Sequence, residues 1–318
     1  MPDVLTQYST TNLSYDLQTY LDKKLLEVAK FRLTLDQFAV KKQLPKGGSK
    51  VIQFNRYDKF TSPSGTPGQL TEGVAPDSEA LAFSKVSATA EQYGKVVKIT
   101  DIAELTVKHD IVQQALEVLG IHAAELYDHL IFNVLAAGTS IVYADGGSNI
   151  NTLTVANSQI TYDHLLNIVA NLDDAGAPQL GDGYVFVVPP QVKAQIQDDA
   201  DFKTANAYLR GEAMWKGEIG HLGGMRIVCS NGPAFTPTAQ TVTGKINKVY
   251  TSFAIGKSSY AVTDLQSLEV INTPPGGLTD PLKQVRALGY KFSMKAAILN
   301  QSWISVFKSA GRNSVNNP

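Results

Sequence analysis

The chain has 318 residues, of which 43% are hydrophobic and 18% are charged. This composition is that of an ordinary globular protein and excludes disorder or low complexity as a description of the whole chain. Because the formal net charge is -1, no overall positive field exists to hold nucleic acid by counterion release, so we expect any such contact to be local and independent of sequence. The single cysteine, Cys229, excludes an intramolecular disulfide framework and a cysteine-based zinc site.

Targeting and membrane signals are the next class to test. Residues 1–20 are polar and lack both a basic start and an apolar run, so we expect neither a signal peptide nor a transit peptide. No window approaches 18 uninterrupted apolar residues, which predicts no transmembrane segment. The length allows two lobes, and we expect these to carry extended arms.

The first third of the chain contains one helical and two strand-like patterns. Residues 11–38 place apolar side chains three and four positions apart and predict an amphipathic helix that packs elsewhere as an arm. Residues 51–57 are rich in β-branched and aromatic side chains and predict a strand. A second strand is predicted at 82–100, where the apolar positions change parity and indicate a bulge or twist.

Between these strands lies a long segment, residues 61–80, that punctuates structure and builds no core. Its turn-forming residues are Pro63, Gly65, Pro67, Gly68, Gly73 and Pro76. A loop of this length fits a hairpin that projects from the body. Because an isolated hairpin is marginally stable in water, we expect it to lie on a neighbouring subunit.

A long helix is predicted from a cap at Asp110 to about Ala137, roughly 40 Å at 1.5 Å per residue. Its apolar stripe consists of Val112, Leu116, Leu119, Ala123, Leu126, Leu130 and Val134. Such a helix is typical of a structural spine.

The rest of the chain alternates between helix and strand and predicts an α/β segment with a mixed sheet. Helices are expected at 161–173 and 191–198, and strands at 183–188, 225–230, 248–255, 258–262 and 268–271. Residues 283–307 alternate apolar and polar side chains. We expect them to return toward the long helix as one long strand or a pair of strands.

Polar clusters that could carry chemistry are few. His122, Glu125, Asp128 and His129 lie at helical spacing, but the two histidines are seven residues apart, about 10 Å along a helix axis. A shared metal ion would therefore need further ligands, and a face turned to solvent or to another subunit is the simpler interpretation. No phosphate-binding, zinc-protease or nucleophile-elbow motif occurs.

Three other groups have equally plain interpretations. The glycines at 217, 220, 223 and 224 precede a strand, which indicates a loop and turn and not a phosphate site. Carboxylates at 173–174 and at 198, 199 and 201 indicate solvated helix ends, or a weak cation site. The basic group Lys41, Lys42, Lys46 and Lys50 beside the hairpin indicates a charged surface or pairing with acidic patches of another subunit.

The succession of arm, hairpin, long helix, α/β segment and returning strand resembles the major capsid proteins of tailed bacteriophages with the Hong Kong 97 fold. The residues LTEG at 70–73, VSATAEQYG at 86–94 and ITD at 99–101, followed by the long helix, look like the phage-N4-type subgroup. The residues GHLGGMRIV at 220–228 resemble the turn and strand of its axial domain.

The resemblance implies an α+β, Hong Kong 97-like fold in five parts. These are an N-terminal arm at 1–47, an extension loop (β-hairpin) at 48–101, a peripheral domain with a spine helix at 102–157, an α/β axial domain at 158–272, and returning peripheral-domain strands with the C-terminus at 273–318. Some relatives carry a long scaffolding segment, whereas this chain has about 45 residues before its first strand. Either a separate scaffold exists or the arm suffices.

The resemblance also implies a function. The chain would self-assemble into hexamers and pentamers of the icosahedral head that encloses double-stranded DNA, as a virion protein assembled in the host bacterial cytoplasm. Its partners would be itself, a scaffolding protein, a portal and a decoration protein, with non-specific contact to packaged DNA. We expect no membrane contact, no cofactor and no enzymatic activity.

Candidate contacts between subunits are Lys46, Arg56, Tyr57, Phe60, Glu72, Glu91 and Tyr93. Two alternatives stay open at this point. One is a soluble metal-dependent enzyme with a site near His122, Glu125 and His129. The other is a different phage structural protein, from the tail or the head decoration.

Overall fold

The structure of the chain, a computed structural model, describes residues 33–44, 49–57, 60, 70, 72–74, 80–106, 108, 110–153, 158–181, 183–200, 221–242, 245–276 and 282–311. Most of the helix expected at 11–38 therefore lies outside the described residues, and its last four residues form a 3₁₀ turn, η1 (Leu35–Phe38). Lys46 and most of the expected loop at 61–80 also lie outside them.

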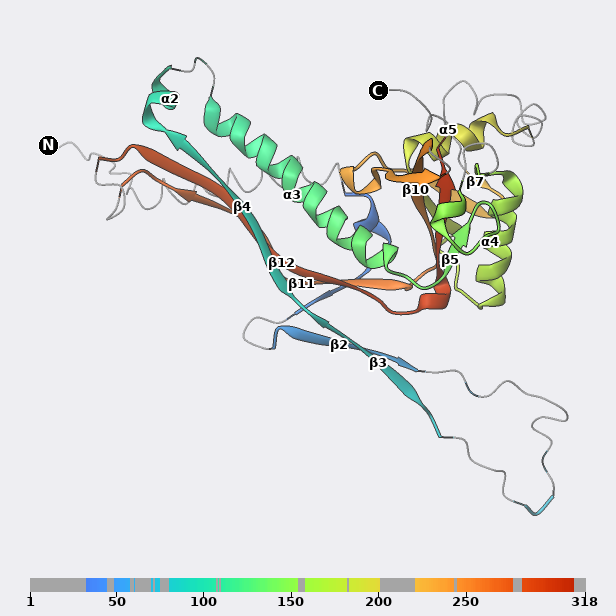
Figure 1. The fold of residues 1–318 in the computed structure, drawn as a ribbon. Coiled ribbons are helices and arrows are strands. Elements are labelled where there is room, and N and C mark those ends of the chain that lie inside the picture. The colour runs from blue at the N-terminus through green and yellow to red at the C-terminus, as the bar shows by residue number, and fades with distance from the viewer. Residues whose placement is uncertain are drawn as a thin grey trace, which may run out of the picture.

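A four-stranded sheet runs along one side of the molecule (Figure 1). Its strand order is β1 (Val40–Gln43), β11 (Tyr260–Thr273), β12 (Val285–Ile298) and β4 (Glu91–Thr100). The pair β1–β11 is parallel, whereas β11–β12 and β12–β4 are antiparallel. The short helix α2 (Asp101–Thr106) follows β4 at the far end of this sheet.

A seven-stranded mixed sheet forms the compact part of the molecule. Its order is β5 (Ile141–Tyr143), β13 (Ile304–Ala310), β10 (Lys245–Ile255), β6 (Tyr184–Val188), β8 (Met225–Cys229) and β7 (His221–Leu222), with β9 (Thr238–Val242) paired to β10. Helices α4 (Tyr162–Asp174) and α5 (Pro190–Asp198) contribute to the buried cluster on one face. Short 3₁₀ turns η2 (Ile150–Thr152), η3 (Pro233–Phe235) and η4 (Gln301–Trp303) connect the elements.

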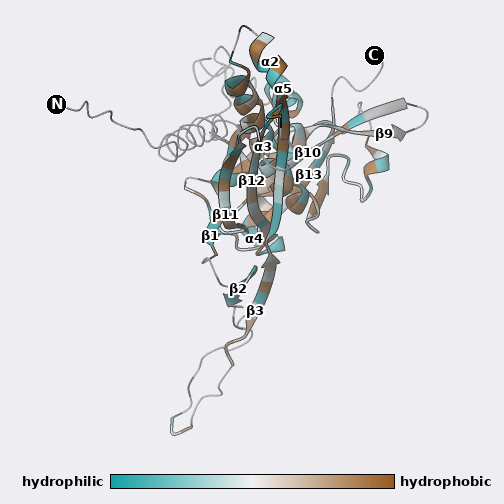
Figure 2. Ribbon diagram, turned by 90° about the vertical axis from the view of Figure 1, so that its left-hand side faces the viewer, coloured by the Kyte–Doolittle hydropathy of each residue, from teal (hydrophilic) through white to brown (hydrophobic). Residues whose placement is uncertain are grey.

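A two-stranded hairpin of β2 (Val51–Tyr57) and β3 (Phe83–Thr89) projects away from both sheets (Figures 1 and 2). The change of parity predicted within 82–100 falls at Ala90, where the chain leaves the hairpin as β3 and enters the four-stranded sheet as β4. The amide of Ala90 donates to the carbonyl of Lys50 at 2.9 Å, which closes the hairpin at this point.

The long helix is confirmed as α3 (Ile111–Ala136), with Asp110 accepting hydrogen bonds from the amides of Val112 and Gln113. Its apolar stripe is only partly as predicted. Leu126, Leu130 and Val134 are only half-buried, beside the core. The buried residues of α3 are Leu116, Leu119, Gly120, Ala123, Ala124, Asp128, Ile131 and Leu135. The buried face is widened because β12 packs on the middle of α3, through Tyr290 and Phe292, while η1 and η3 pack on its later turns.

The remaining elements mostly agree with the sequence pattern. The two short strands expected at 258–262 and 268–271 are one strand, β11, because register shifts between Asp264 and Gln266 and between Gln266 and Glu269 interrupt its alternation. The returning segment is a pair of strands, β12 and β13, as one of the two expectations had it.

The two sheets are not built from consecutive parts of the chain, and the domain boundaries at 157/158 and 272/273 stay a prediction. Strand β5 precedes the first boundary but pairs with β13 in the seven-stranded sheet. Strand β11 precedes the second boundary but belongs to the four-stranded sheet, and β13 follows it but does not. Sheet membership is set by pairing between distant segments, which local patterns do not encode.

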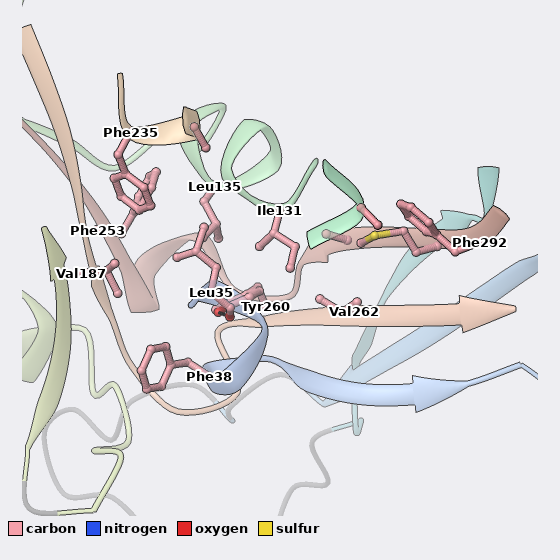
Figure 3. Close-up of a cluster of buried hydrophobic side chains, with 14 of the residues drawn as sticks. Leu35, Phe38, Ile131, Leu135, Val187, Phe235, Phe253, Tyr260, Val262 and Phe292 are labelled. Atoms are coloured by element: carbon pink, nitrogen blue, oxygen red, sulfur yellow. Dashed lines mark hydrogen bonds between the residues drawn. The ribbon is translucent and has the colours of Figure 1, made fainter. Parts of the chain in front are cut away.

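The main core lies where α3, η1 and the two sheets meet. Figure 3 shows Leu35 and Tyr260 beside Ile131 and Leu135 of α3, with Phe253 of β10 close to Leu135. The side chains of β6 alternate between this core and the cluster under α4 and α5, so all five of its residues are buried. None of the described helices is long and apolar enough to span a membrane.

Ile131→Ala is expected to lower the free energy of unfolding by about 2–5 kcal/mol, because the removed methyl groups leave a cavity where the side chain is fully buried. The matched control is Val118→Ala on the same helix, which is 64% exposed and should change stability by less than about 0.5 kcal/mol. Urea unfolding of the two variants measures the difference. Equal effects would contradict the proposed position of α3.

Candidate interaction surfaces

The root of the hairpin is anchored on the body by a small apolar cluster. Its members are Leu44, Ile52, Phe54, Ala88, Ala90 and Ala261. The ammonium group of Lys42 lies 5.6 Å from the ring centre of Phe54 and covers one side of the cluster. The root therefore holds the direction of the hairpin relative to β11.

Beyond the root, the hairpin exposes large apolar side chains to solvent. These are Phe60, Leu70, Val74, Leu81 and Phe83, and Val51 is exposed at the root itself, opposite Thr89. Two strands alone cannot bury such side chains, and scattered partial cover, such as Lys85 over the ring of Phe83 at 5.2 Å, leaves most of them open. A gathered set of this kind marks a surface that binds something.

A second group of exposed apolar side chains lies at the opposite end of the molecule, which we call the distal end of the four-stranded sheet. It comprises Val96, Ile102, Leu105, Ile271 and Leu282. Two of these lie on α2, and the others lie on or beside β4, β11 and β12. Figures 1 and 2 both place α2 and the hairpin at opposite ends, so one copy cannot cover its own distal end with its hairpin.

The predicted contact residues of the hairpin are not brought into one site. Arg56 and Tyr57 lie on β2 opposite Ser84 and Phe83. Phe60 and Glu72 are exposed beyond the strands, and Lys46 lies outside the described residues. The hairpin thus presents these residues along its length, as an extended surface would and a catalytic pocket would not.

Glu91 and Tyr93, the last two predicted contact residues, are brought together at the start of β4. The Tyr93 hydroxyl donates to Glu91 Oε2 at 2.6 Å, and Lys295 Nζ donates to Glu91 Oε1 at 3.2 Å. These bonds hold the pKa of Glu91 below its usual value, and burial, with the bond to Glu91, raises the pKa of Tyr93 to about 12. Both side chains therefore already brace β4 against β12.

The polar cluster on the long helix differs from its sequence interpretation. His122 Nδ1 lies 2.6 Å from the hydroxyl of Tyr290, and His129 Nδ1 lies 3.0 Å from the amide of Asn133. Asp128, expected on a solvated or subunit-facing side, is only 3% exposed. Across the described ranges, no three His, Cys, Asp or Glu side chains stand together in a way that could hold a metal ion.

Asp128 instead anchors the segment that precedes β1. Its two carboxylate oxygens accept the amide hydrogens of Thr34 and Leu35, each at 3.1 Å. The carbonyl of Leu35 in turn accepts the hydroxyl of Tyr260, and the Leu35 side chain is fully buried beside Ile131 (Figure 3). The contact was missed, although Asp128 sits four residues after Ala124 and three before Ile131, on the apolar face itself.

Other carboxylates surround this anchor. Asp36 is paired with Lys41, and the Tyr127 hydroxyl donates to Asp264 Oδ1 at 3.1 Å. Burial raises the pKa of Asp128 to about 6, even though the backbone amides of Thr34, Leu35 and Asp36 favour its ionised form. Burial also raises the pKa of Asp264. Ionisation of Asp128 is thus favoured by the backbone amides and opposed by the burial of its carboxyl group.

A cavity of about 370 Å³ opens beside these carboxylates, between η1, α3 and β11. Its walls are mainly apolar, from Leu33, Ala123, Leu268 and Phe292. The polar groups at its edge already bind one another as just described. Gln266 and Ser267 complete the polar part of the lining.

The acidic helix ends at Asp173, Asp174 and Asp198 are exposed, as expected, and two of the carboxylates of these groups also accept hydrogen bonds. The Tyr184 hydroxyl donates to Asp173 at 2.6 Å, and Asp199 accepts the amide of Tyr162 at 2.9 Å at the start of α4. Asp201 lies outside the described residues. The turn predicted at Gly223 and Gly224 is confirmed, because both have positive φ between β7 and β8.

Comparison with known proteins gives a consistent result. A family model described as phage capsid protein matches residues 84–302. The capsid protein of Ralstonia phage GP4 has 12% identity and a TM-score of 0.66, with 90% of this chain and 93% of that chain covered. The capsid of cyanophage Pam1 has 12% identity and a TM-score of 0.66, with 86% of this chain and 89% of that chain covered. The capsid of cyanophage P-SCSP1u has 16% identity and a TM-score of 0.61, with 86% of this chain and 87% of that chain covered. A sequence search of curated proteins gives no match.

Asp128→Asn tests the anchor through pH. Because the pKa of Asp128 is raised in the folded protein, the folded state binds an extra proton between about pH 4 and pH 6. The stability that protonation of Asp128 contributes therefore grows as the pH falls through this window and is lost as the pH rises through about 6. The wild type should gain about 1 kcal/mol over Asp128→Asn between pH 7 and pH 5.

Urea unfolding of unassembled protein at the two pH values measures this gain. Asp174→Asn, at the exposed end of α4, is the control and should keep the pH dependence of the wild type. Parallel stability curves for the wild type and Asp128→Asn would rule out a raised pKa at the anchor.

Proposed function

Because the chain belongs to the phage capsid protein family, whose model matches residues 84–302, we propose that it is the major capsid protein of a tailed phage. It self-assembles into hexamers and pentamers of an icosahedral head that encloses double-stranded DNA. The observation that carries this proposal is the pair of exposed apolar surfaces at opposite ends of the molecule, on the hairpin and on the distal end of the four-stranded sheet.

Surfaces at opposite ends of a chain favour heterologous contacts, in which one patch meets a different patch on the next copy. Such contacts close into rings when the rotation between copies is right, and rings of five and six are what an icosahedral shell requires. Each contact can be individually modest, because every copy is held by several neighbours at once.

The parts of the chain take roles in this scheme. The β2–β3 hairpin, within 48–101, is the extension loop that lies over an adjacent copy, and α3 is the spine of the peripheral domain. The sheet with α4 and α5 is the main part of the axial domain around the capsomer axes. The exposed Phe60 and Glu72, with Arg56 and Tyr57 on β2, are contact residues of the loop. The remaining contact residues are Glu91 and Tyr93 at the start of β4, and Lys46, which precedes β2 in the sequence.

The wider assembly follows from the same proposal. The likeness in short motifs at 70–73, 86–94 and 99–101 supports the phage-N4-type subgroup. A separate scaffolding protein, a portal and a decoration protein are the expected partners, and packaged DNA is touched without sequence preference. The protein is a component of the virion and is assembled in the host bacterial cytoplasm.

Electron microscopy of the chain, expressed alone and together with its scaffolding gene, tests the function directly. Shells, tubes or isolated rings of five and six copies are expected in at least one of the two preparations. A small monodisperse monomer in both would contradict the proposal, and a trimer would favour a tail or decoration protein.

Replacing residues 61–80 by Asn-Gly, which forms a tight hairpin turn, tests the role of the loop. We expect the melting temperature to change by less than about 4 °C, because none of the described residues of this segment (70, 72–74 and 80) belongs to the three buried clusters. The yield of shells should fall at least roughly tenfold, as multivalent assembly amplifies the loss of one contact per copy. Normal shells from the shortened chain would overturn the interlocking role.

A further inference from the structure

A pocket of about 260 Å³ lies where the hairpin meets the body of the molecule. On the hairpin side it is lined by Phe54 of β2 and Val86 of β3, which are directly opposite each other, and by Arg56 farther out on β2. On the body side it is lined by Leu299, which follows β12, and by Trp303 of η4. Because Phe54, Val86 and Leu299 also take part in the apolar cluster at the root, the pocket adjoins the contact that holds the hairpin on the body.

The walls of this pocket are mainly apolar. They are formed by Phe54, Val86, Leu299 and Trp303, two of which carry aromatic rings. Pockets that bind small organic molecules combine such walls with a few polar groups, and those for drug-sized ligands have volumes of about 300–1,000 Å³. This pocket is slightly smaller, at about 260 Å³. It therefore suits a ligand of one ring with a single polar substituent.

The charged groups of the pocket favour an anion. Among the described residues that line it are the cations Lys42 and Arg56 and no carboxylate. Lys42 Nζ lies 5.6 Å from the ring centre of Phe54, and within the described ranges no carboxylate forms an ion pair with it. An ammonium group beside an aromatic wall can bind the charged end of an aromatic anion.

Asn300 adds a hydrogen-bond donor to the same pocket. Its Oδ1 accepts the amide of Ser302 at 3.1 Å and thereby caps η4. The side-chain nitrogen of Asn300 is therefore the group left to donate to a ligand. Carboxylate and phosphate oxygens accept hydrogen bonds from amide and ammonium groups alike, so Asn300 and Lys42 favour the same kind of ligand.

From these observations we propose that the pocket binds a small aromatic anion, a single ring that carries one carboxylate or phosphate group. The ring packs on Phe54, Leu299 and Trp303, and the anionic group binds Lys42 and Asn300. Because one ligand then contacts both the hairpin and the body, it stabilises the hairpin root in its position on the body. The site lies within one copy, so it does not depend on the proposed assembly and can be measured on the unassembled chain.

The fluorescence of Trp303 measures this binding in the full-length chain. The other tryptophan is Trp215, so Trp215→Phe leaves Trp303 as the reporter. Benzoate and phenyl phosphate should each change the emission saturably, with a dissociation constant of about 1 mM or below. Inorganic phosphate, which lacks the ring, and benzyl alcohol, which lacks the charge, should bind at least roughly tenfold more weakly. No saturable change with either aromatic anion, or equally tight binding of either control compound, would overturn the site.

Matched substitutions test the position of the anionic group. Asn300→Asp keeps the oxygen that caps η4 but adds a negative charge to the pocket, and it should weaken benzoate binding at least roughly fivefold. Asn149→Asp is its control and should not, because Asn149 Oδ1 caps η2 in the same way, with the amide of Asn151 at 3.1 Å. Lys42→Gln should weaken binding to a similar extent, whereas Lys98→Gln, at an exposed position of β4, should not. Wild-type affinity in Asn300→Asp or in Lys42→Gln would contradict the proposal.

Hydrogen exchange measures the effect of the ligand on the hairpin. With benzoate at tenfold its dissociation constant, the paired amides of β2 and β3 near Phe54 and Val86 should exchange roughly tenfold more slowly, because opening of the strands here separates the walls of the site. Amides of β8, in the seven-stranded sheet, are the control and should exchange as before. Saturable binding without slower exchange in the hairpin would overturn the stabilisation of the root, and equal slowing in β8 would contradict a local site.

Discussion

The packing of α3 on β12 is the constraint on which the rest of the molecule depends. One face of β12 supplies Leu288, Tyr290, Phe292 and Met294 to the core under the helix. An antiparallel sheet with one apolar face needs such a cover to be stable in water. The helix is long enough to bind the sheet to the compact part, where Ile131 and Leu135 enter the core shared by both sheets. The packing thereby fixes the position of the four-stranded sheet, with its distal end, relative to the compact part of the molecule.

The anchor at Asp128 fixes a third point, where the segment before β1 enters the core. A buried carboxylate is costly unless hydrogen bonds compensate it, and here both oxygens accept backbone amides. The amides belong to Thr34 and Leu35, so the burial of the carboxylate and the burial of Leu35 depend on each other. Removing one partner would leave the other unsatisfied, which makes the entry point of the N-terminal segment specific.

The exposed large apolar side chains are concentrated on a few surfaces of the molecule. Nearly all the large ones lie on the hairpin, on the distal end of the four-stranded sheet or on α3, and Leu166 of α4 is the exception among the described residues. In the part of the chain that the structure describes, no three His, Cys, Asp or Glu side chains are grouped so that they could hold a metal ion. A molecule with exposed apolar surfaces at two opposite ends is suited to repeated contact with copies of itself.

Local signals in the sequence determined the individual elements. The cap at Asp110 and the spacing of Leu116, Leu119 and Ala123 predicted α3. The β-branched and aromatic composition of β2, the apolar run of β6 and the alternation of the returning segment predicted strands. These predictions succeeded because helix and strand periodicity depend on neighbours a few residues apart. The hairpin was also predictable, since a segment rich in glycine and proline between two strands has few other places to go.

Only the tertiary structure decided which sheet each strand joined and which polar groups became internal. Strands β5 and β13 pair across 160 residues of chain, and β11 joins the four-stranded sheet although β10, just before it, joins the other. Asp128 was assigned to a polar face, because its partners, the amides of Thr34 and Leu35, lie more than 90 residues away. Long-range pairing depends on the complementarity of surfaces that form only when the chain is folded, and sequence periodicity carries no record of it.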